Sequence, residues 1–239
     1  MNARPSEALF REWDLYDRIV HDNWMAHREI SAAIRSSIGR MEGPLKVLDL
    51  GSGDGEMAAR SLSGSEISRY VAVDLSESAL ERLERRPHFG TQQACNRQII
   101  CRDMAAVVRD LDEASFDLVL ASYSLHHFPT DQKGPLLDRI ARLLRAGGCF
   151  IWTDSARHAG EALDDYLQRL TTALDSQWVS IPLADRRAAI EHVLTCDFPE
   201  QPRWMHEQLA MRGLNLAEEA YRDALFGTWI YVKSTQAGQ

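Results

Sequence analysis

Residues 47–58 read VLDLGSGDGEMA, and this stretch decides how the rest of the chain is interpreted. It begins inside an apolar run, LKVLDL, whose length and branched residues are typical of a strand buried on both faces. Glycines follow at positions 51, 53 and 55, and a helical pattern starts near Met57. Glycine permits positive φ and close approach to a ligand, and a helix N-terminus offers unpaired N–H groups. The stretch therefore predicts a strand, a ligand-binding loop and a helix.

A carboxylate accompanies this loop. Asp74 lies nineteen residues beyond Gly55, directly after the second apolar run, YVAV. An acid at the end of a second strand can accept the hydroxyls of a ribose. The glycine spacing is G-x-G-x-G, whereas dinucleotide sites use G-x-G-x-x-G, and Asp49 stands two residues before Gly51. Because an acid here repels a diphosphate and suits a cation, the residues favour S-adenosylmethionine over NAD.

The remaining pattern alternates short apolar runs with helical periodicity. Between residues 45 and 154 the runs are LKVLDL, YVAVD, QIICRD, FDLVLAS and CFIWTD. This alternation predicts an α/β fold with a mainly parallel sheet and right-handed crossovers. The first 40 residues, including Leu9 and Phe10, have helical spacing, and FGTWIYVKS near the end alternates as a strand does.

We interpret the whole chain, residues 1–239, as a single domain. Its predicted parts are an N-terminal helical cap, a cofactor-binding core, a helical cover inserted after the fifth strand, and closing strands. Their boundaries are 1–43, 44–154, 155–212 and 213–239, respectively.

On these motifs the sequence resembles the class I S-adenosylmethionine-dependent methyltransferases, over roughly residues 40–155. The resemblance implies a Rossmann-like, seven-stranded, mostly parallel sheet with helices on both faces and an antiparallel last strand. It implies that Asp74 binds the ribose, that Leu75, Asp103 and Met104 surround the adenine, and that Ser122 lies beside the methionine moiety. The loop residues that it adds to the cofactor site are Asp49, Gly51, Ser52, Gly53 and Gly55.

The segment WDLYDRIVHDNWMAHRE resembles the leading segments of small-molecule methyltransferases. On this basis Tyr16 is expected to line the cofactor pocket and Arg28 to pair with the methionine carboxylate. The alternative for Arg28 is a solvated charge on a helix.

Candidate catalytic residues follow the fourth strand in ASYSLHHF: Tyr123, His126 and His127. This loop faces the crevice at the carboxyl ends of the strands, and a histidine there can accept a proton near neutral pH. Methyl transfer from a sulfonium is an in-line displacement that needs a base only when the acceptor arrives protonated. The alternative is that one histidine simply packs or caps the loop. The other histidines, among them His192, are interpreted as surface or packing residues.

Composition narrows the possible partners. The chain has 27 Lys and Arg against 35 Asp and Glu, a net charge of −8, which disfavours a uniformly basic nucleic-acid surface. Ser122-Tyr123-Ser124 also stands where amino-group methyltransferases acting on DNA commonly carry an Asn/Asp-Pro-Pro-Tyr/Phe motif. No apolar run approaches the roughly 20 residues of a membrane span. The four cysteines lack C-x-x-C spacing, so we expect reduced thiols, a cytoplasmic location and no metal ligands.

The sequence thus predicts a cytoplasmic methyltransferase that uses S-adenosylmethionine and acts on a small-molecule acceptor, without nucleic-acid or membrane partners. Alternatives are a cofactor-binding sensor or scaffold without turnover and a protein methyltransferase. A nicotinamide dehydrogenase is disfavoured by Asp49 and the glycine spacing. No oligomeric state is assigned.

Overall fold

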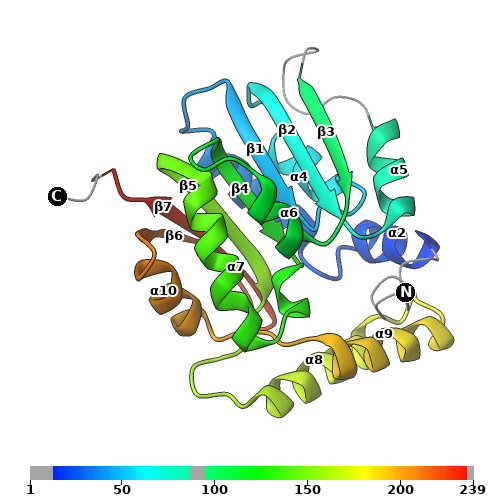
Figure 1. Cartoon of the computed structure of the whole chain (residues 1–239). Coiled ribbons are helices and arrows are strands. Elements are labelled where there is room, and N and C mark those ends of the chain that lie inside the picture. The colour runs from blue at the N-terminus through cyan, green and yellow to red at the C-terminus, as the bar shows by residue number, and fades with distance from the viewer. Residues whose placement is uncertain (1–12, 87–94, 236–239) are drawn as a thin grey trace.

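Seven strands form one sheet in the order β3-β2-β1-β4-β5-β7-β6 (Figure 1). The computed structural model describes residues 13–86 and 95–235. Its strands are β1 (Leu45–Leu50), β2 (Ile67–Asp74), β3 (Asn96–Cys101), β4 (Phe116–Ser122), β5 (Leu144–Ser155), β6 (Leu214–Arg222) and β7 (Phe226–Lys233). Neighbours among β1–β5 pair in parallel, and β7 is antiparallel to both β5 and β6. The predicted fold class is confirmed.

Helices connect most of the strands. They are α2 (Trp13–His21), α3 (His27–Ile38), α4 (Glu56–Ser61), α5 (Glu77–Arg85), α6 (Met104–Asp110), the short 3-10 helix η1 (Leu125–His127), α7 (Thr130–Leu143), α8 (Leu163–Gln177), α9 (Leu183–Cys196) and α10 (Pro202–Ala210). The helical region at the N-terminus is interrupted between α2 and α3, where Asn23 and Ala26 have φ values of 62° and 52°. The predicted helical positions Leu9 and Phe10 lie outside the described residues.

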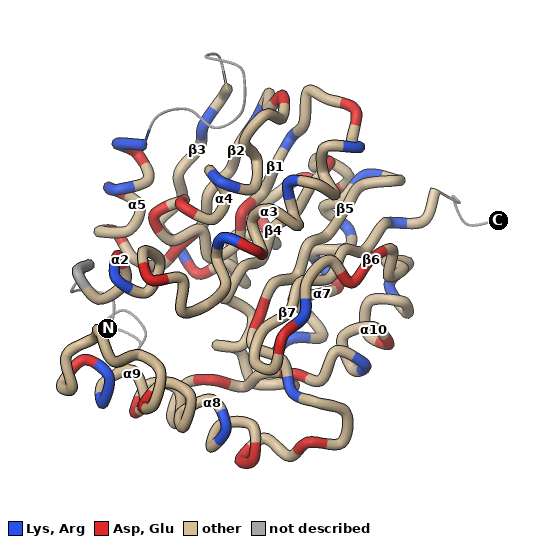
Figure 2. The backbone as a smooth tube through the Cα atoms, turned by 180° about the vertical axis from the view of Figure 1, so that it is seen from behind, with Lys and Arg blue, Asp and Glu red and all other residues tan. Residues whose placement is uncertain are grey.

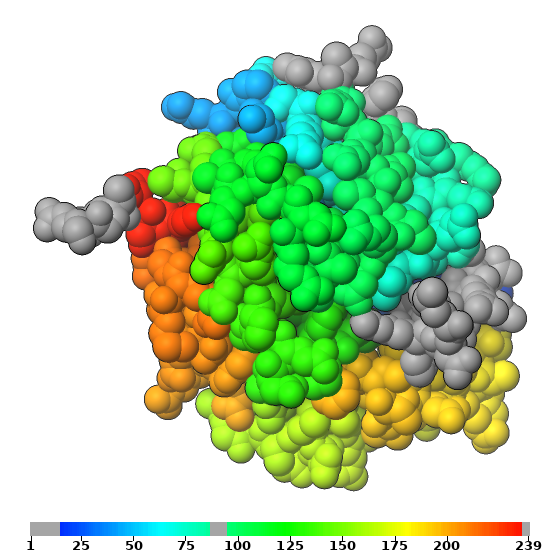
Figure 3. Space-filling view, viewed as in Figure 1, coloured from blue at the N-terminus to red at the C-terminus, as the bar shows by residue number. Residues whose placement is uncertain are grey.

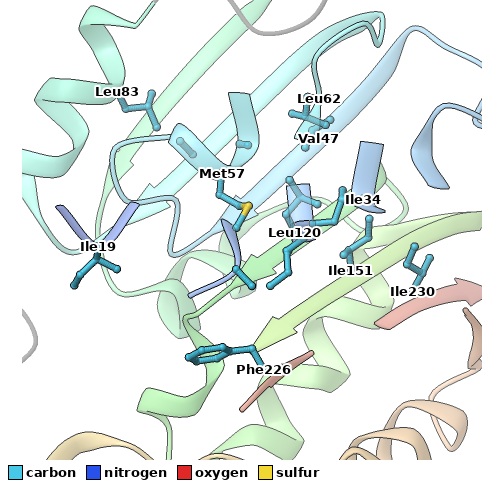
Figure 4. Packing of buried hydrophobic residues seen from close by; sticks show 14 of the residues in the cluster. Ile19, Ile34, Val47, Met57, Leu62, Leu83, Leu120, Ile151, Phe226 and Ile230 are labelled. Carbon is cyan, nitrogen blue, oxygen red and sulfur yellow. The ribbon is translucent and has the colours of Figure 1, made fainter. Parts of the chain in front are cut away.

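The sheet separates two apolar clusters, because successive side chains of a strand point to opposite faces. Val47 of β1 contributes to the cluster beneath α3 and α4, whereas Leu48 and Leu50 contribute to the one beneath α6, α7 and α10. Figure 4 shows Val47, Met57 and other apolar side chains of the first cluster. Each fully buried aliphatic side chain stabilises the fold by about 1.5–3 kcal/mol.

Helices α8 and α9 pack on each other at the end of the molecule where the parallel strands finish (Figure 1). Leu170 and Leu174 of α8 and Val193 of α9 join the cluster beneath α3. Figure 3 shows these helices, yellow-green to gold, below the green helix α7. The predicted cover, 155–212, also contains α10, which packs instead against α7 and β6. In the structure, α8 and α9 therefore cover the carboxyl edge of the sheet without α10.

Charged residues of both signs are distributed along most elements (Figure 2). Within the described ranges, no helix combines the length and the apolar character that crossing a bilayer demands. No disulfide links the four cysteines, each of which falls in a described segment.

Candidate functional site

The loop between β1 and α4 depends on its glycines. Gly51, Gly53 and Gly55 have φ values of 73°, 53° and 77°, in the left-handed region that L-residues with a side chain avoid. A Cβ on Gly51 would lie 2.4 Å from the Cβ of Ser124, so this position also lacks space for a side chain. The Gly51 N–H donates to the carbonyl of Val73 at 2.8 Å, which ties the loop to the end of β2.

Three carboxylates stand at or just beyond the ends of adjacent parallel strands. Asp49 lies on β1, Asp74 ends β2, and Asp103 follows β3. Asp74 accepts hydrogen bonds from the backbone N–H groups of Gly53 and Ser76, both at 2.8 Å. Asp103 caps α6, because its side chain accepts a hydrogen bond from a backbone N–H in the first turn of that helix. The acids predicted from separate motifs therefore meet at one edge of the sheet.

A cavity of about 270 Å³ opens at this edge. Its lining contains nearly all of the predicted site: Tyr16, Asp49, Gly51, Ser52, Gly53, Asp74, Leu75, Asp103, Met104, Ser122, Tyr123, His126 and His127. Apolar residues of α8 and α9, including Leu170, Leu174 and Val193, complete the wall. The cavity thus runs from the glycine loop to the cover.

Two residues that were predicted to bind the cofactor do not line the cavity. Gly55 caps the start of α4 and is not among the described residues that line the cavity. Arg28 is exposed, its guanidinium donates to the carbonyl of His21, and it does not line the cavity either. The structure therefore does not bring Arg28 to the site, because the turn before α3 directs its buried neighbour His27 inward.

The electrostatics of the cavity suit a cation without phosphate. Burial raises the pKa of Asp49 to about 7, although a hydrogen bond from Tyr70 opposes the shift. Burial also raises the pKa of Asp74. Among the described lining residues, Arg102 is the one Lys or Arg. Five aspartates in the lining, a glycine cradle without room for Cβ at Gly51 and few cations fit a sulfonium nucleoside better than a dinucleotide.

Tyr123 forms part of the wall. Its φ of 53° is unusual for an aromatic residue, and its hydroxyl donates to the carbonyl of Met25. The centroid of the Tyr123 ring lies 5.5 Å from that of His27 and 5.6 Å from that of Phe226. Burial raises the pKa of Tyr123 well above 10. The structure thus engages this hydroxyl in linking the end of β4 to the α2–α3 turn.

His126 and His127 meet two acids that sequence reasoning missed. His126 Nδ1 contacts a carboxylate oxygen of Asp154, and Oδ1 of Asp197 lies 3.7 Å from His126 Nε2 and 3.3 Å from His127 Nδ1. Burial disfavours the charged imidazole, but the two carboxylates outweigh it and raise the pKa of His126 to about 9. Burial lowers the pKa of His127.

A third histidine completes this group. His192 Nε2 lies 3.6 Å from Oδ1 of Asp197, and burial lowers the pKa of His192 to about 4. The sequence could have identified Asp154 as a site residue, because it ends the apolar run CFIWTD as Asp74 ends YVAVD. No sequence pattern identifies His192 and Asp197 as site residues, since they belong to a helix end whose position depends on tertiary packing.

Comparison with known proteins identifies the chain's relatives. Residues 47–148 match the family described as a methyltransferase domain. The chain is 28% identical over 195 residues to the carboxy-S-adenosyl-L-methionine synthase of Helicobacter hepaticus, spanning 78% of this chain and 75% of that protein. It is 35% identical over 120 residues to the sarcosine/dimethylglycine N-methyltransferase of Halorhodospira halochloris, spanning 50% of this chain and 41% of that protein.

Solved structures agree on the fold. The magnesium protoporphyrin IX methyltransferase of Synechocystis, solved with S-adenosylhomocysteine bound, has a TM-score of 0.65 and 16% identity, over 96% of this chain and 98% of that one. The glycine loop, the acids at three strand ends and the matched domain lead to one conclusion. Residues 47–148 form a methyltransferase domain of the class I S-adenosylmethionine-dependent type, whose cofactor is S-adenosylmethionine.

Proposed function

We propose that this protein methylates a small molecule enclosed between the glycine loop and the cover helices α8 and α9. The observation that carries the proposal is the continuity of one cavity from Asp74 and Asp103 to Leu170 and Val193. Such a cavity favours an acceptor that is enclosed whole over a folded macromolecule. The methylated acceptors in the names of relatives, sarcosine and dimethylglycine among them, are also small.

S-adenosylmethionine supplies an electrophilic methyl group on sulfur. The chain's contribution is to hold the acceptor in line with that group, and positioning alone accounts for up to about 7–11 kcal/mol in model reactions. The apolar side chains of Leu170, Leu174 and Val193 exclude water from the acceptor's side of the cavity. In this proposal Tyr123 positions the wall, because its hydroxyl is already donated to Met25.

His126 and His127 are proposed to contact the acceptor, since both line the same cavity. A base role for His127 remains a prediction from the sequence.

A second candidate is synthesis of a modified cofactor. It is favoured by the 28% identity to a carboxy-S-adenosyl-L-methionine synthase across 78% of this chain. The two candidates differ in product, because methyl transfer yields S-adenosylhomocysteine and a methylated acceptor, whereas the second reaction alters the mass of the cofactor itself.

The deciding experiment incubates the protein with S-adenosylmethionine and a panel of small metabolites, with peptides and lysate protein in parallel, followed by mass spectrometry. We expect S-adenosylhomocysteine and a metabolite heavier by one methylene. An Asp74→Asn variant serves as the control with an impaired cofactor site. Transfer only to the protein arm, a heavier cofactor without transfer, or cofactor binding without any product would each reject small-molecule methylation.

A further inference from the structure

Three imidazoles surround one carboxylate oxygen at the cover end of the cavity. The distances from Asp197 Oδ1 are 3.3 Å to His127 Nδ1, 3.6 Å to His192 Nε2 and 3.7 Å to His126 Nε2. His126, His127 and Asp197 offer ligand atoms that all lie within 4.8 Å of one another. They come from η1 and from the end of α9, elements that are distant in sequence.

Several polar atoms in this group are buried without a hydrogen bond. Among the described residues, Asp197 Oδ1, His127 Nδ1 and both ring nitrogens of His192 have no hydrogen-bond partner. A buried polar group left unpaired costs about 1–3 kcal/mol, and more when it is charged. Asp197 Oδ1 and His127 Nδ1 lie 3.3 Å apart, so one cation between them would satisfy both, and His126 offers a further ligand atom within 4.8 Å of each.

We propose that His126, His127 and Asp197 bind one divalent transition-metal ion of the zinc class. A tetrahedral site with bonds of about 2.0–2.2 Å places neighbouring ligand atoms about 3.3–3.6 Å apart. The distances of 3.3 and 3.7 Å from Asp197 Oδ1 to the two imidazoles are close to that separation. Two imidazoles and one carboxylate are ligands that zinc and iron(II) accept, and three protein ligands leave a coordination position open.

The surroundings of the proposed ligands support a site that is already formed. His126 Nδ1 is held by Asp154, which leaves Nε2 directed at Asp197. Asp154 in turn accepts hydrogen bonds from Trp152 Nε1 at 3.1 Å and from the backbone N–H groups of His126 and Ser155. A carboxylate behind a metal-binding histidine orients the ring and raises its basicity. The backbone N–H of Phe198 also donates to the carbonyl of His126 at 2.7 Å, which joins the two ligand segments.

His192 lies beside the proposed ligands, since its Nε2 is 3.6 Å from Asp197 Oδ1 and its ring centroid is 5.4 Å from that of His127. All four side chains line the cavity assigned to the cofactor and acceptor. The metal would therefore hold an acceptor through an anionic oxygen, as a carboxylate, phenolate or enolate. This assignment of acceptor class rests on the proposed function, whereas metal binding by these residues does not.

Calorimetry with zinc on untagged, metal-stripped, cofactor-free protein tests the site. We expect one ion per chain, and at least a hundredfold weaker binding in Asp197→Asn and in His127→Gln. His158→Ala is the matched control, because it removes an exposed histidine outside the cluster and should bind zinc as the parent does. Substitution of cobalt(II) adds a visible spectrum that reports on coordination independently of turnover.

Affinity lost in either variant that unfolds cooperatively, with His158→Ala unchanged, supports the site. Absence of stoichiometric binding to the parent, or binding that survives both substitutions, overturns it. S-adenosylhomocysteine binding is measured on the same samples. Zinc binding without methyl transfer would reject the proposed function and keep the site, and methyl transfer by a protein that binds no zinc would do the reverse.

Discussion

The phenol of Tyr70 donates a 2.6 Å hydrogen bond to Asp49, and both side chains are buried beside the glycine loop. Burial raises the pKa of Asp49 to about 7, and the bond from Tyr70 limits that rise because it stabilises the carboxylate. Asp49 therefore has a pKa near neutrality, and its side chain lines the cavity at the strand ends.

This pKa predicts that affinity for S-adenosylmethionine depends on pH. At pH 6 most of Asp49 is protonated, and at pH 8 most of it is ionised, which is the form that a cation prefers. With a pKa of about 7 in the free protein, affinity should rise by up to about tenfold between pH 6 and pH 8. Calorimetry at several pH values measures the change.

The Asp49→Asn variant is the control for this measurement. Titration of the cofactor itself is common to both proteins, so the difference between their pH profiles isolates Asp49. Tyr70→Phe should displace the rise to higher pH, since it removes the bond that favours the carboxylate. Identical slopes in the parent and in Asp49→Asn would contradict the prediction.

Gly51 and Gly53 allow backbone strain to be separated from steric overlap. Both have positive φ, but a Cβ on Gly51 would meet Ser124 at 2.4 Å, whereas a Cβ on Gly53 would meet nothing within 4 Å. Gly53→Ala should cost about 1–2 kcal/mol of unfolding free energy from conformation alone. Gly51→Ala should cost about 1–3 kcal/mol more, because overpacking is added.

Denaturant unfolding measures both costs. In a Ser124→Gly background the cost of Gly51→Ala should fall toward that of Gly53→Ala, since the atom that it meets is absent. Equal costs for the two alanines in the parent would mean that the loop relaxes away from Ser124.

The cover helix α9 offers a test of the acceptor region. Ala189 is buried and lines the cavity, whereas Ala188 beside it is exposed. Ala189→Trp should fill the acceptor's side of the cavity and reduce methyl transfer at least tenfold, with affinity for S-adenosylhomocysteine changed less than threefold. Ala188→Trp adds the same group to the same helix and should leave both quantities unchanged. Loss of cofactor binding in Ala189→Trp alone would place the cofactor, not the acceptor, beneath α9.

The grouping of the three acids at one edge of the sheet was predictable because these residues follow strands in sequence. Each of Asp49, Asp74 and Asp103 is tied to an apolar run, and adjacent parallel strands finish at one edge of a sheet. Arg28 was placed by resemblance of the leading segment, and it lies outside the cavity lining because the turn between α2 and α3 is not evident in the sequence. The left-handed residues Asn23 and Ala26 rotate α3 so that His27 faces the cavity.

The histidine cluster was only half predictable. His126 and His127 follow β4 and were identified from that position, but Asp197 and His192 reach them through the tertiary placement of α9, which packs against α8. The periodicity of a sequence does not predict a contact of this kind between distant elements. A titratable residue on a cover helix therefore has to be located in the structure before its chemistry can be assigned.

The segment that carries Asp197 is anchored by a buried ion pair, and this anchor gives the final prediction. Lys133 of α7 and Glu200 are 2% and 3% exposed, and Lys133 Nζ lies 2.8 Å from Glu200 Oε1. Lys133 also donates to the carbonyl of Phe198, next to Asp197. Lys133→Met leaves the Glu200 carboxylate buried without this partner and should cost about 3–5 kcal/mol of unfolding free energy.

The double variant Lys133→Met/Glu200→Gln should recover part of this loss, because the Glu200 carboxylate is then no longer charged. The recovery is incomplete, since Arg157, 3.4 Å from Glu200 Oε2, loses its carboxylate partner. Arg203→Met is the comparison, since it removes one partner of an exposed pair with Glu207 and should change stability by less than about 1 kcal/mol. Denaturant unfolding of the parent, Lys133→Met, Glu200→Gln and the double variant gives the coupling between Lys133 and Glu200 directly. Additive single losses would show that the pair is not coupled. Zinc affinity measured on Lys133→Met should also fall, because Asp197 lies three residues before Glu200 and would lose its fixed position opposite His127.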